Sequence, residues 1–372
     1  MSDFRTFLTK HAGPGFLAGI TVGDWLRLLA ANRFRISPQH LARAIGITLS
    51  TPLNSALRLA ENALFNGAIA RTNLAPPVFI LGSWRSGTTY LHTLLSTDQR
   101  FGCPNLYETM FPYTYLLTEV WWRPILQTLV PRKRFMDNME MSLSEPHEDE
   151  MALAIMTQRS NMLAWIFPER AKEYEKFLSF AEATEADRGA WKAALAWYVR
   201  KIAYSTGKQV VLKSPNHTAR IKLILETFPD AKFLHIRRHP YDVYRSMCHM
   251  AGNVIPMWGL QAYRHNRIPR MVIEWYAELY DSFFDALPLV PAGQYFELKY
   301  EELAADPVNQ IEAAYGALGL PDFAAARAGV EAHVATQKAY QKNKHADLDA
   351  ATREKLARKW RRCFEAWDYA QD

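Results

Sequence analysis

Cysteine is scarce and scattered in this sequence, with three residues, Cys103, Cys248 and Cys363, in a chain of 372. They form no C-x-x-C pair, and any disulfide bond would leave one of them over. We therefore expect neither a disulfide framework nor a cysteine-based zinc site. Because no secretory signal is visible either, we expect an intracellular, cytoplasmic protein.

Long apolar runs are also lacking. No uninterrupted apolar stretch reaches about 18 residues, so the sequence predicts no transmembrane helix. Membrane contact would then be peripheral, and residues 110–131 are the segment that suits it, since they are rich in aromatic side chains. Two interpretations of this segment stay open: a buried helix followed by a turn, or a segment seated at the surface or at an acceptor site.

No strong excess of one charge is present. Lys and Arg number 44 against 38 Asp and Glu, which gives a net charge of +6. This balance suits an anionic ligand or a membrane surface. No concentrated basic stripe with interleaved aromatics is found, so nucleic acid is not an expected partner. No H-x-x-x-H or clustered Asp/His set occurs, and we expect no metal.

Two regions differ in their pattern. The pattern of residues 1–75 predicts helices at 23–33, 38–47 and 52–71. The last two begin at prolines, which are tolerated in a first helical turn. The sequence Ala75-Pro76-Pro77 resembles a short linker. We therefore predict an N-terminal helical extension over residues 1–75 and a second domain over residues 76–372.

The second region alternates between strand and helix patterns. Short apolar runs occur at 78–82, 210–213, 232–236 and 294–298, and helical patterns separate them. This order predicts an α/β fold with a P-loop-like parallel sheet flanked by helices.

The most specific motif is the loop Gly82-Ser-Trp-Arg-Ser-Gly-Thr-Thr89, between the first strand and the next helix. Such a loop directs backbone N–H groups and a helix N-terminus at an anion. Its glycines have the spacing of the nucleotide-binding P-loop, but Thr88 stands where that motif has lysine. The cation is Arg85, inside the loop. We therefore expect a phosphate-like ligand whose transferring end differs from a γ-phosphate.

A second candidate anion site follows the third strand. Arg238 comes directly after that strand, and Ser246 lies about two turns into the next helix. An arginine and a serine placed in this way can hold one anion from two sides. Together, the two sites suit a nucleotide with two separate phosphate positions.

These residues resemble a known family. The segments GSWRSGTTYLH (82–92), VLKSP (211–215), RRHPYDVYRSM (237–247) and KYEELAADP (299–307) are similar to those of sulfotransferases that use 3′-phosphoadenosine-5′-phosphosulfate (PAPS). The R-S-G-T-T loop resembles the bacterial branch and the tyrosylprotein and heparan types. The resemblance covers roughly residues 76–350.

The resemblance implies roles for individual residues. It implies that the loop binds the 5′-phosphosulfate and that Arg238 and Ser246 bind the 3′-phosphate. A C-terminal basic segment at 337–344 with Lys342 would contribute by analogy of position and charge. The implied nucleotide-binding set is Arg85, Ser86, Gly87, Thr88, Thr89, Tyr90, Arg238, Ser246 and Lys342.

The resemblance also implies catalytic residues. Arg85 and Lys213 would stabilise charge on the leaving oxygen. The acceptor hydroxyl needs a base, and two candidates stay open. Glu108 fits by position, whereas the histidine of the small-molecule branch is replaced by Pro215, with His217 the nearest alternative.

We therefore expect a PAPS-dependent sulfotransferase that releases 3′,5′-ADP (PAP) and acts on a hydroxyl acceptor. The aromatic content favours an apolar acceptor such as a lipid, a sterol or an aromatic alcohol. A P-loop small-molecule kinase with a degenerate loop is the alternative, and a non-catalytic nucleotide- or membrane-binding protein is a third. The oligomeric state cannot be derived from the sequence.

Overall fold

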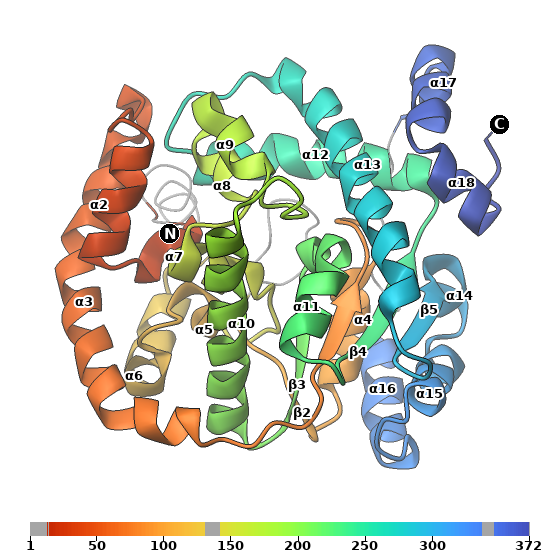
Figure 1. Ribbon diagram of the computed structural model, residues 1–372, viewed down its shortest axis with the longest axis horizontal. Helices are drawn as coiled ribbons and strands as arrows, with labels where there is room; N and C mark the ends of the chain where they lie inside the picture. Colours follow the sequence, from red (N-terminus) through yellow and green to blue (C-terminus); the bar gives the residue numbers. More distant parts are fainter. Residues whose placement is uncertain (1–12, 14, 131–141, 337–345, 372) are drawn as a thin grey trace. The chain divides into compact units, whose positions relative to one another are not determined.

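The computed structural model describes residues 13, 15–130, 142–336 and 346–371. The chain divides into two compact units, and each unit contains three separate segments of the chain. Figure 1 colours the ribbon by residue number, so the segments can be located by colour. Unit 1 contains the residues through Asn73, residues 104–207 and residues 251–265. Unit 2 contains residues 74–103, 208–250 and the residues from 266 onward. A domain boundary after residue 75 stays a prediction, since the first 73 residues share a unit with two later segments.

Unit 2 contains a five-stranded sheet in the order β2-β3-β1-β4-β5. All neighbouring strands are parallel, which confirms the predicted α/β fold with a parallel sheet. The strands are β1 (Val78–Leu81), β2 (Phe101–Gly102), β3 (Gln209–Lys213), β4 (Lys232–Arg237) and β5 (Tyr295–Lys299). The four apolar runs correspond to β1, β3, β4 and β5, whereas the two-residue β2 was not predicted.

The register of the sheet brings the strand ends together. Ile80 of the central strand β1 pairs with Lys213 of β3 and with Leu234 of β4. Farther along, Arg237 pairs with Lys299 at the end of β5. Because parallel strands end at the same edge of a sheet, the segments that follow β1, β3, β4 and β5 meet at one edge.

Helices flank this sheet in unit 2. Leu91, Leu94 and Leu95 of α4 pack with the strands in one buried core. The helices are α4 (Thr88–Ser96), η5 (Pro215–Arg220), α11 (Ile221–Thr227), α12 (Pro240–Trp258, whose residues from Ala251 on belong to unit 1), α13 (Ile268–Ala286), η7 (Leu287–Leu289), α14 (Tyr300–Ala305), α15 (Pro307–Ala317), α16 (Ala324–Thr336), α17 (Ala350–Lys359) and α18 (Arg361–Trp367), with η6 (His265–Arg267) at the segment boundary.

In its described part, unit 1 is helical. Its longest element, α3, has 30 residues and packs against α2, α6 and α10 (Figure 1). The helices are η2 (Gly15–Gly19), α2 (Val22–Ala31), η3 (Pro38–His40), α3 (Leu41–Ala70), α5 (Leu106–Met110), α6 (Tyr115–Gln127), α7 (Glu150–Thr157), α8 (Leu163–Ile166), η4 (Pro168–Arg170), α9 (Ala171–Glu175) and α10 (Glu185–Thr206).

The prediction of a helix start at Pro52 was wrong, because α3 runs through this proline. Proline has no N–H to donate to the carbonyl four residues earlier, which here belongs to Thr48. The Thr51 hydroxyl donates to that carbonyl oxygen instead, at 2.9 Å. Pro52 is also exposed, so its ring meets solvent. One continuous helix therefore replaces the expected break between residues 47 and 52.

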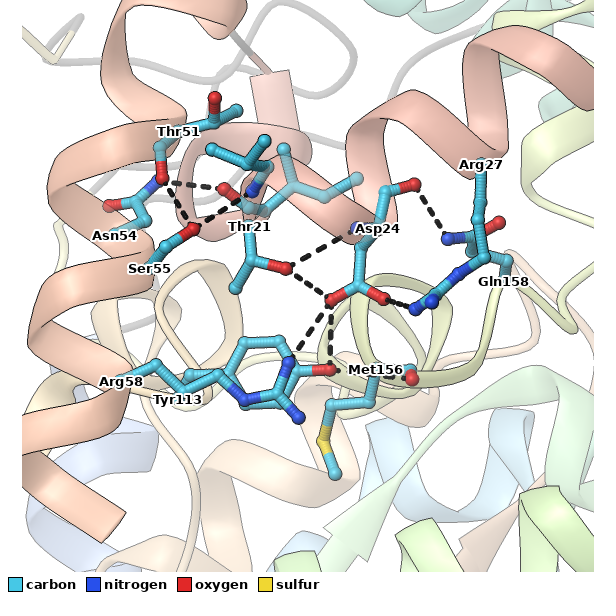
Figure 2. A network of polar contacts seen from close by, with 12 residues as sticks. Thr21, Asp24, Arg27, Thr51, Asn54, Ser55, Arg58, Tyr113, Met156 and Gln158 are labelled. Carbon is cyan, nitrogen blue, oxygen red and sulfur yellow. Dashed lines mark hydrogen bonds and ion pairs between the residues drawn. The ribbon is translucent and has the colours of Figure 1, made fainter. Parts of the chain in front are cut away.

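A polar network joins the N-terminal helices to the rest of unit 1 (Figure 2). The carboxylate of Asp24 in α2 is buried and accepts hydrogen bonds from Thr21 Oγ1 at 2.6 Å and from Arg58 of α3 at 3.3 Å. The hydroxyl of Tyr113 donates to the same carboxylate at 3.4 Å. Gln158 donates to the Asp24 carbonyl at 2.7 Å. These contacts bind residues from two chain segments into one unit.

The aromatic segment 110–131 is seated at the surface over its second half. Val120, Trp121 and Ile125 of α6 are 76%, 74% and 60% exposed. The interpretation as a buried helix is therefore wrong for this part, and the surface interpretation is confirmed. Among the described residues, no helix is long and apolar enough to cross a membrane.

Candidate active site

The loop between β1 and α4 depends on its two glycines. Gly82 has φ 141° and Gly87 has φ 104°, which disfavour residues with a side chain. A Cβ atom at Gly82 would lie 2.5 Å from the carbonyl oxygen of Ile236 in β4, and one at Gly87 would lie 2.4 Å from Cδ2 of Tyr300. The glycines thus allow the loop to lie directly against the ends of β4 and β5.

Hydrogen bonds hold this loop in place. The Ser86 hydroxyl donates to the Ser83 carbonyl at 2.8 Å. The Gly82 amide donates to Thr218 Oγ1 at 2.7 Å, and the Ser83 amide donates to the Tyr280 hydroxyl at 3.1 Å. The loop leads into α4, whose first turn presents backbone N–H groups, and such a terminus favours an anion.

Arg85 connects the two anion-binding motifs predicted from the sequence. Its Nε donates to the Ser246 hydroxyl at 2.9 Å, and its carbonyl oxygen accepts from Arg238 Nη1 at 3.1 Å. Its φ of 69° is a left-handed conformation that few residues with side chains adopt. Residues separated by more than 150 positions in the chain therefore meet at the carboxyl edge of the sheet.

Arg238 is held from two sides. Its guanidinium carbon lies 4.5 Å from the centre of the Tyr300 ring, and Nη2 lies 3.6 Å from the Asp242 carboxylate. Asp242 also pairs with Arg245. Burial opposes ionisation of Asp242, but the hydrogen bond from Arg245 and the charges of both arginines outweigh it and lower its pKa. Asp242 thus faces two arginines, of which Arg245 also pairs with the exposed Asp347 at 3.1 Å.

Lys213 adds a cation at the end of β3. It is 2% exposed. Burial first, and then the charge of Lys213, lower the pKa of His92 in α4 to about 3. His92 is therefore neutral at physiological pH and does not add to the positive charge at this edge.

The candidate base His217 lies in unit 2, in η5. It is fully buried, and its ring meets the Phe79 ring edge-on with 5.2 Å between centres. Ser214 directly follows β3, and its carbonyl oxygen accepts a hydrogen bond from the His217 amide at 3.1 Å. His217 thus lies among the residues that follow β3, as its position in the sequence suggested.

The other candidate base, Glu108, belongs to unit 1 and has a structural role there. Its carboxylate accepts the Asn105 amide at 2.7 Å, and the Asn105 side chain accepts the Glu108 amide at 2.9 Å. This reciprocal pair caps α5. Burial is the largest influence on Glu108 and raises its pKa to about 8. Because Arg85 and Lys213 belong to unit 2, the role of Glu108 as base stays a prediction.

A buried ion pair lies in the same unit as Glu108. The ammonium of Lys201 pairs with the carboxylate of Glu61, and the two side chains are 0% and 2% exposed. Lys201 also donates to the Pro112 carbonyl at 2.6 Å and lies 4.1 Å from the centre of the Tyr115 ring. Burial lowers the pKa of Lys201 to about 8 and raises that of Glu61. Sequence analysis missed this pair, since no local pattern connects residues 140 positions apart.

The remaining predicted residues lie at the start of α4 or beyond the described part. Ser86 and Thr88 are buried, and Gly87, Thr89 and Tyr90 are half-buried. Lys342 lies outside the described residues. Tyr300 was missed, although its position directly after the strand QYFELK was a usable signal. In the part of the chain that is described, no group of three or more His, Cys, Asp or Glu residues could hold a metal ion.

Comparison with known proteins shows the family of this chain. A model of the sulfotransferase family matches residues 76–325. The omega-hydroxy-beta-dihydromenaquinone-9 sulfotransferases Stf3 of Mycobacterium bovis and Mycobacterium tuberculosis are 35% identical over 352 residues, which cover 94% of this chain and 90% of the relative.

Two solved structures share the fold. Sulfotransferase STF1 of Mycobacterium tuberculosis superposes with a TM-score of 0.67 at 17% identity, covering 91% of each chain. STF9 of Mycobacterium avium gives 0.66 at 15% identity, covering 94% of this chain and 97% of that one. The family model spans the sheet, the glycine loop and Arg238, and the relatives extend the similarity over nearly the whole chain. This chain therefore belongs to the sulfotransferase family and is a sulfotransferase.

Proposed function

We propose that this sulfotransferase moves a sulfuryl group from PAPS to the hydroxyl of an apolar, lipid-like acceptor and releases PAP. The donor follows from the resemblance in the loop at 82–89 and around Arg238. The acceptor class is suggested by the relative Stf3, which is named for an omega-hydroxy dihydromenaquinone, a hydroxyl-bearing quinone. The abundance of aromatic residues in this chain agrees with such an acceptor.

The observation that supports the donor best is the contact of Arg85 with both Ser246 and Arg238. PAPS differs from ATP in carrying phosphate at the 3′ position as well as the 5′ position. A protein that distinguishes them needs two neighbouring anion sites, one for the 5′-phosphosulfate and one for the 3′-phosphate of the same ribose. The β1 loop offers amides, hydroxyls and Arg85 for the first site, and Arg238 with Ser246 offers charge-assisted hydrogen bonds for the second.

The reaction balances as a single in-line displacement. The acceptor oxygen forms a bond to sulfur while the bond from sulfur to the 5′-phosphate oxygen of PAP breaks. The acceptor proton passes to a base, for which Glu108 and His217 are the candidates. Arg85 and Lys213 would stabilise the charge that develops on the leaving oxygen. The kinase alternative is disfavoured by Thr88 in the lysine position and by the family to which the chain belongs.

Nucleotide binding tests the donor. In Arg238→Ala, the affinity for 3′,5′-ADP should fall by about 1.5–3 kcal/mol because one charge-assisted phosphate contact is lost. The affinity for 5′-ADP should change much less. Titration calorimetry with both nucleotides measures the difference. Arg270→Ala is the matched control, since Arg270 is exposed and pairs with Glu274 on α13. An equal loss for both nucleotides would remove Arg238 from the 3′-phosphate site.

A transfer assay with two acceptors, tested in separate reactions, tests the acceptor class. The full chain is incubated with labelled PAPS and either an omega-hydroxylated dihydromenaquinone in mixed micelles or a small phenol. Mass analysis then identifies the sulfated product. We expect sulfated quinone and little sulfated phenol. Transfer to the phenol alone would reject the apolar acceptor while leaving the donor proposal intact.

A further inference from the structure

The outer face of α3 carries no charge. Helix α3 has 30 residues, which corresponds to a length of about 45 Å. Its exposed residues are all uncharged and mostly apolar, namely Leu41, Ala42, Ile45, Gly46, Thr48, Leu49, Pro52, Leu53, Ala56, Leu59, Ala60, Ala63, Leu64, Asn66, Gly67 and Ala70. A helix on the surface of a globular protein normally exposes charged and polar residues to water. The exposed face of α3 has the opposite polarity.

The charged residues of α3 pair inside unit 1 instead, although the Arg58 side chain is also 37% exposed. Arg43 is fully buried and donates to the Gly259 carbonyl at 2.6 Å, within unit 1. Glu61 is 1% exposed and pairs with Lys201. Arg58 reaches the buried Asp24 (Figure 2). Because these charges are satisfied inside the unit, the apolar outer face is a consistent property of the helix and not a local exception.

The large apolar side chains on this face form one band. Leu41, Ile45, Leu49, Leu53, Leu59 and Leu64 are between 48% and 75% exposed. At 3.6 residues per turn, they fall within an arc of roughly 140°. Helix α6, which packs against α3 in the same unit (Figure 1), also exposes large apolar side chains, namely Trp121, Trp122 and Ile125, at 74%, 43% and 60% exposure. We call these nine residues the docking face.

The charge in the segment that contains α3 is mainly of one sign, although Arg35 pairs with the exposed Glu169, and Arg123 of α6 pairs with Glu119. Residues 15–73 contain two acidic residues, Asp24 and Glu61, and both are buried. The exposed charges of the same segment are all arginines, namely Arg27, Arg33, Arg35 and Arg71. Arg33 and Arg35 come shortly before α3, and Arg71 follows it directly. The apolar band thus lies between cationic ends.

We propose that unit 1 docks on the surface of an anionic lipid bilayer through the docking face. An apolar band would enter the boundary between headgroups and acyl chains, with its cationic ends at anionic headgroups. Tryptophan is favoured at that boundary because its ring is apolar and its N–H is polar. A second copy of the chain fits less well, since a two-fold contact would bring identical cationic ends together.

Docking is a property of unit 1 and does not require the acceptor proposed above. It would give the enzyme access to an acceptor that stays dissolved in the membrane. The two proposals fail separately, because vesicle binding can be measured without donor or acceptor. Nucleotide binding by unit 2 should be the same in the variants that follow.

Vesicle flotation tests the proposal. The full chain should float with vesicles of phosphatidylcholine and phosphatidylglycerol, and less with phosphatidylcholine alone. In Leu49→Glu/Leu59→Glu, the partition into anionic vesicles should fall at least roughly ten-fold, because two charges enter the apolar band. Both side chains are more than 70% exposed, so the fold should tolerate the change. Leu289→Glu is the matched control, since Leu289 is 53% exposed in unit 2.

A fluorescence measurement gives a second readout. Vesicles with brominated acyl chains should quench part of the tryptophan emission, and this part should disappear in Trp121→Phe/Trp122→Phe. Flotation that the glutamate variant retains, or wild-type protein that does not float, would overturn the proposal. A wild-type dimer in light scattering that Leu49→Glu/Leu59→Glu makes monomeric would overturn it too, because the face would then bind a second copy.

Discussion

The two units of this sulfotransferase place their charges in opposite ways. In unit 2, Arg85, Arg238 and Lys213 gather at the carboxyl edge of a parallel sheet, with Asp242 as a partial counter-charge. In unit 1, Lys201 is buried against Glu61, and the surface of α3 is uncharged. Several cations gathered at the end of parallel strands suit an anionic ligand, whereas a buried pair of opposite charges such as Lys201 and Glu61 contributes to folding. The comparison therefore separates functional from structural charges by where they gather in the fold and not by their burial.

Glu108 would be an exception to this comparison, because it is a buried acidic residue of unit 1 that is proposed to act in catalysis. In Glu108→Gln, kcat should fall about 10²–10⁴-fold if the carboxylate accepts the acceptor proton. Glutamine can still accept the Asn105 amide, so the helix cap should persist. A base must be ionised, and burial raises the pKa of Glu108 to about 8. The wild-type rate should therefore rise as pH increases through about 8, and the variant should lose that rise.

The control for this experiment is His217→Gln, measured over the same pH range. Both variants should bind 3′,5′-ADP normally if they retain the fold. Near-normal turnover in Glu108→Gln, together with inactive His217→Gln that still binds nucleotide, would transfer the role of base to His217.

Breaking the buried pair of unit 1 should produce the next largest effect. Lys201→Met leaves Glu61 buried without its cation, and the free energy of unfolding should fall by about 3–5 kcal/mol. Urea unfolding measures this loss. Lys172→Met, at an exposed position in α9, is the matched control. Adding Glu61→Gln should restore part of the stability. A Lys201→Met protein as stable as the control would mean that the pair is not needed for folding.

The smallest expected effect is on nucleotide binding by unit 2, and it tests how much the Ser246 hydroxyl contributes. Ser246→Ala removes a neutral hydroxyl that accepts a hydrogen bond from Arg85. The affinity for 3′,5′-ADP should fall by about 0.5–1.5 kcal/mol, with little change in unfolding. Ser282→Ala on α13 serves as control. A loss as large as that of Arg238→Ala would mean that the hydroxyl and the guanidinium act as one unit.

The sequence predicted the parts of the site that follow from strand order. The apolar runs located β1, β3, β4 and β5, and parallel strands necessarily end at one edge. The loop with Arg85 and the segment with Arg238 could therefore be expected to meet, and the Arg238 side chain does donate to the Arg85 carbonyl. The base was harder to predict, because Glu108 and His217 fit by position alone.

Other features depend on contacts that no local pattern encodes. Helix α3 continues through Pro52 because the Thr51 side chain replaces a missing backbone hydrogen bond. The two residues of β2 are too few to show an apolar period. The partnership of Glu61 with Lys201, and the assembly of unit 1 from three separate segments, appear only when the chain is folded.

The interleaving of the two units has a consequence for synthesis. Translation completes the last segment of unit 1 at residue 265, when α13 and β5 of unit 2 do not yet exist. Strand β4 then has one edge unpaired until residues 295–299 emerge and form β5. Unpaired strand edges are sites of aggregation. Slow codons or a truncation between residues 265 and 295 should therefore harm the yield of folded enzyme more than the same change after residue 300.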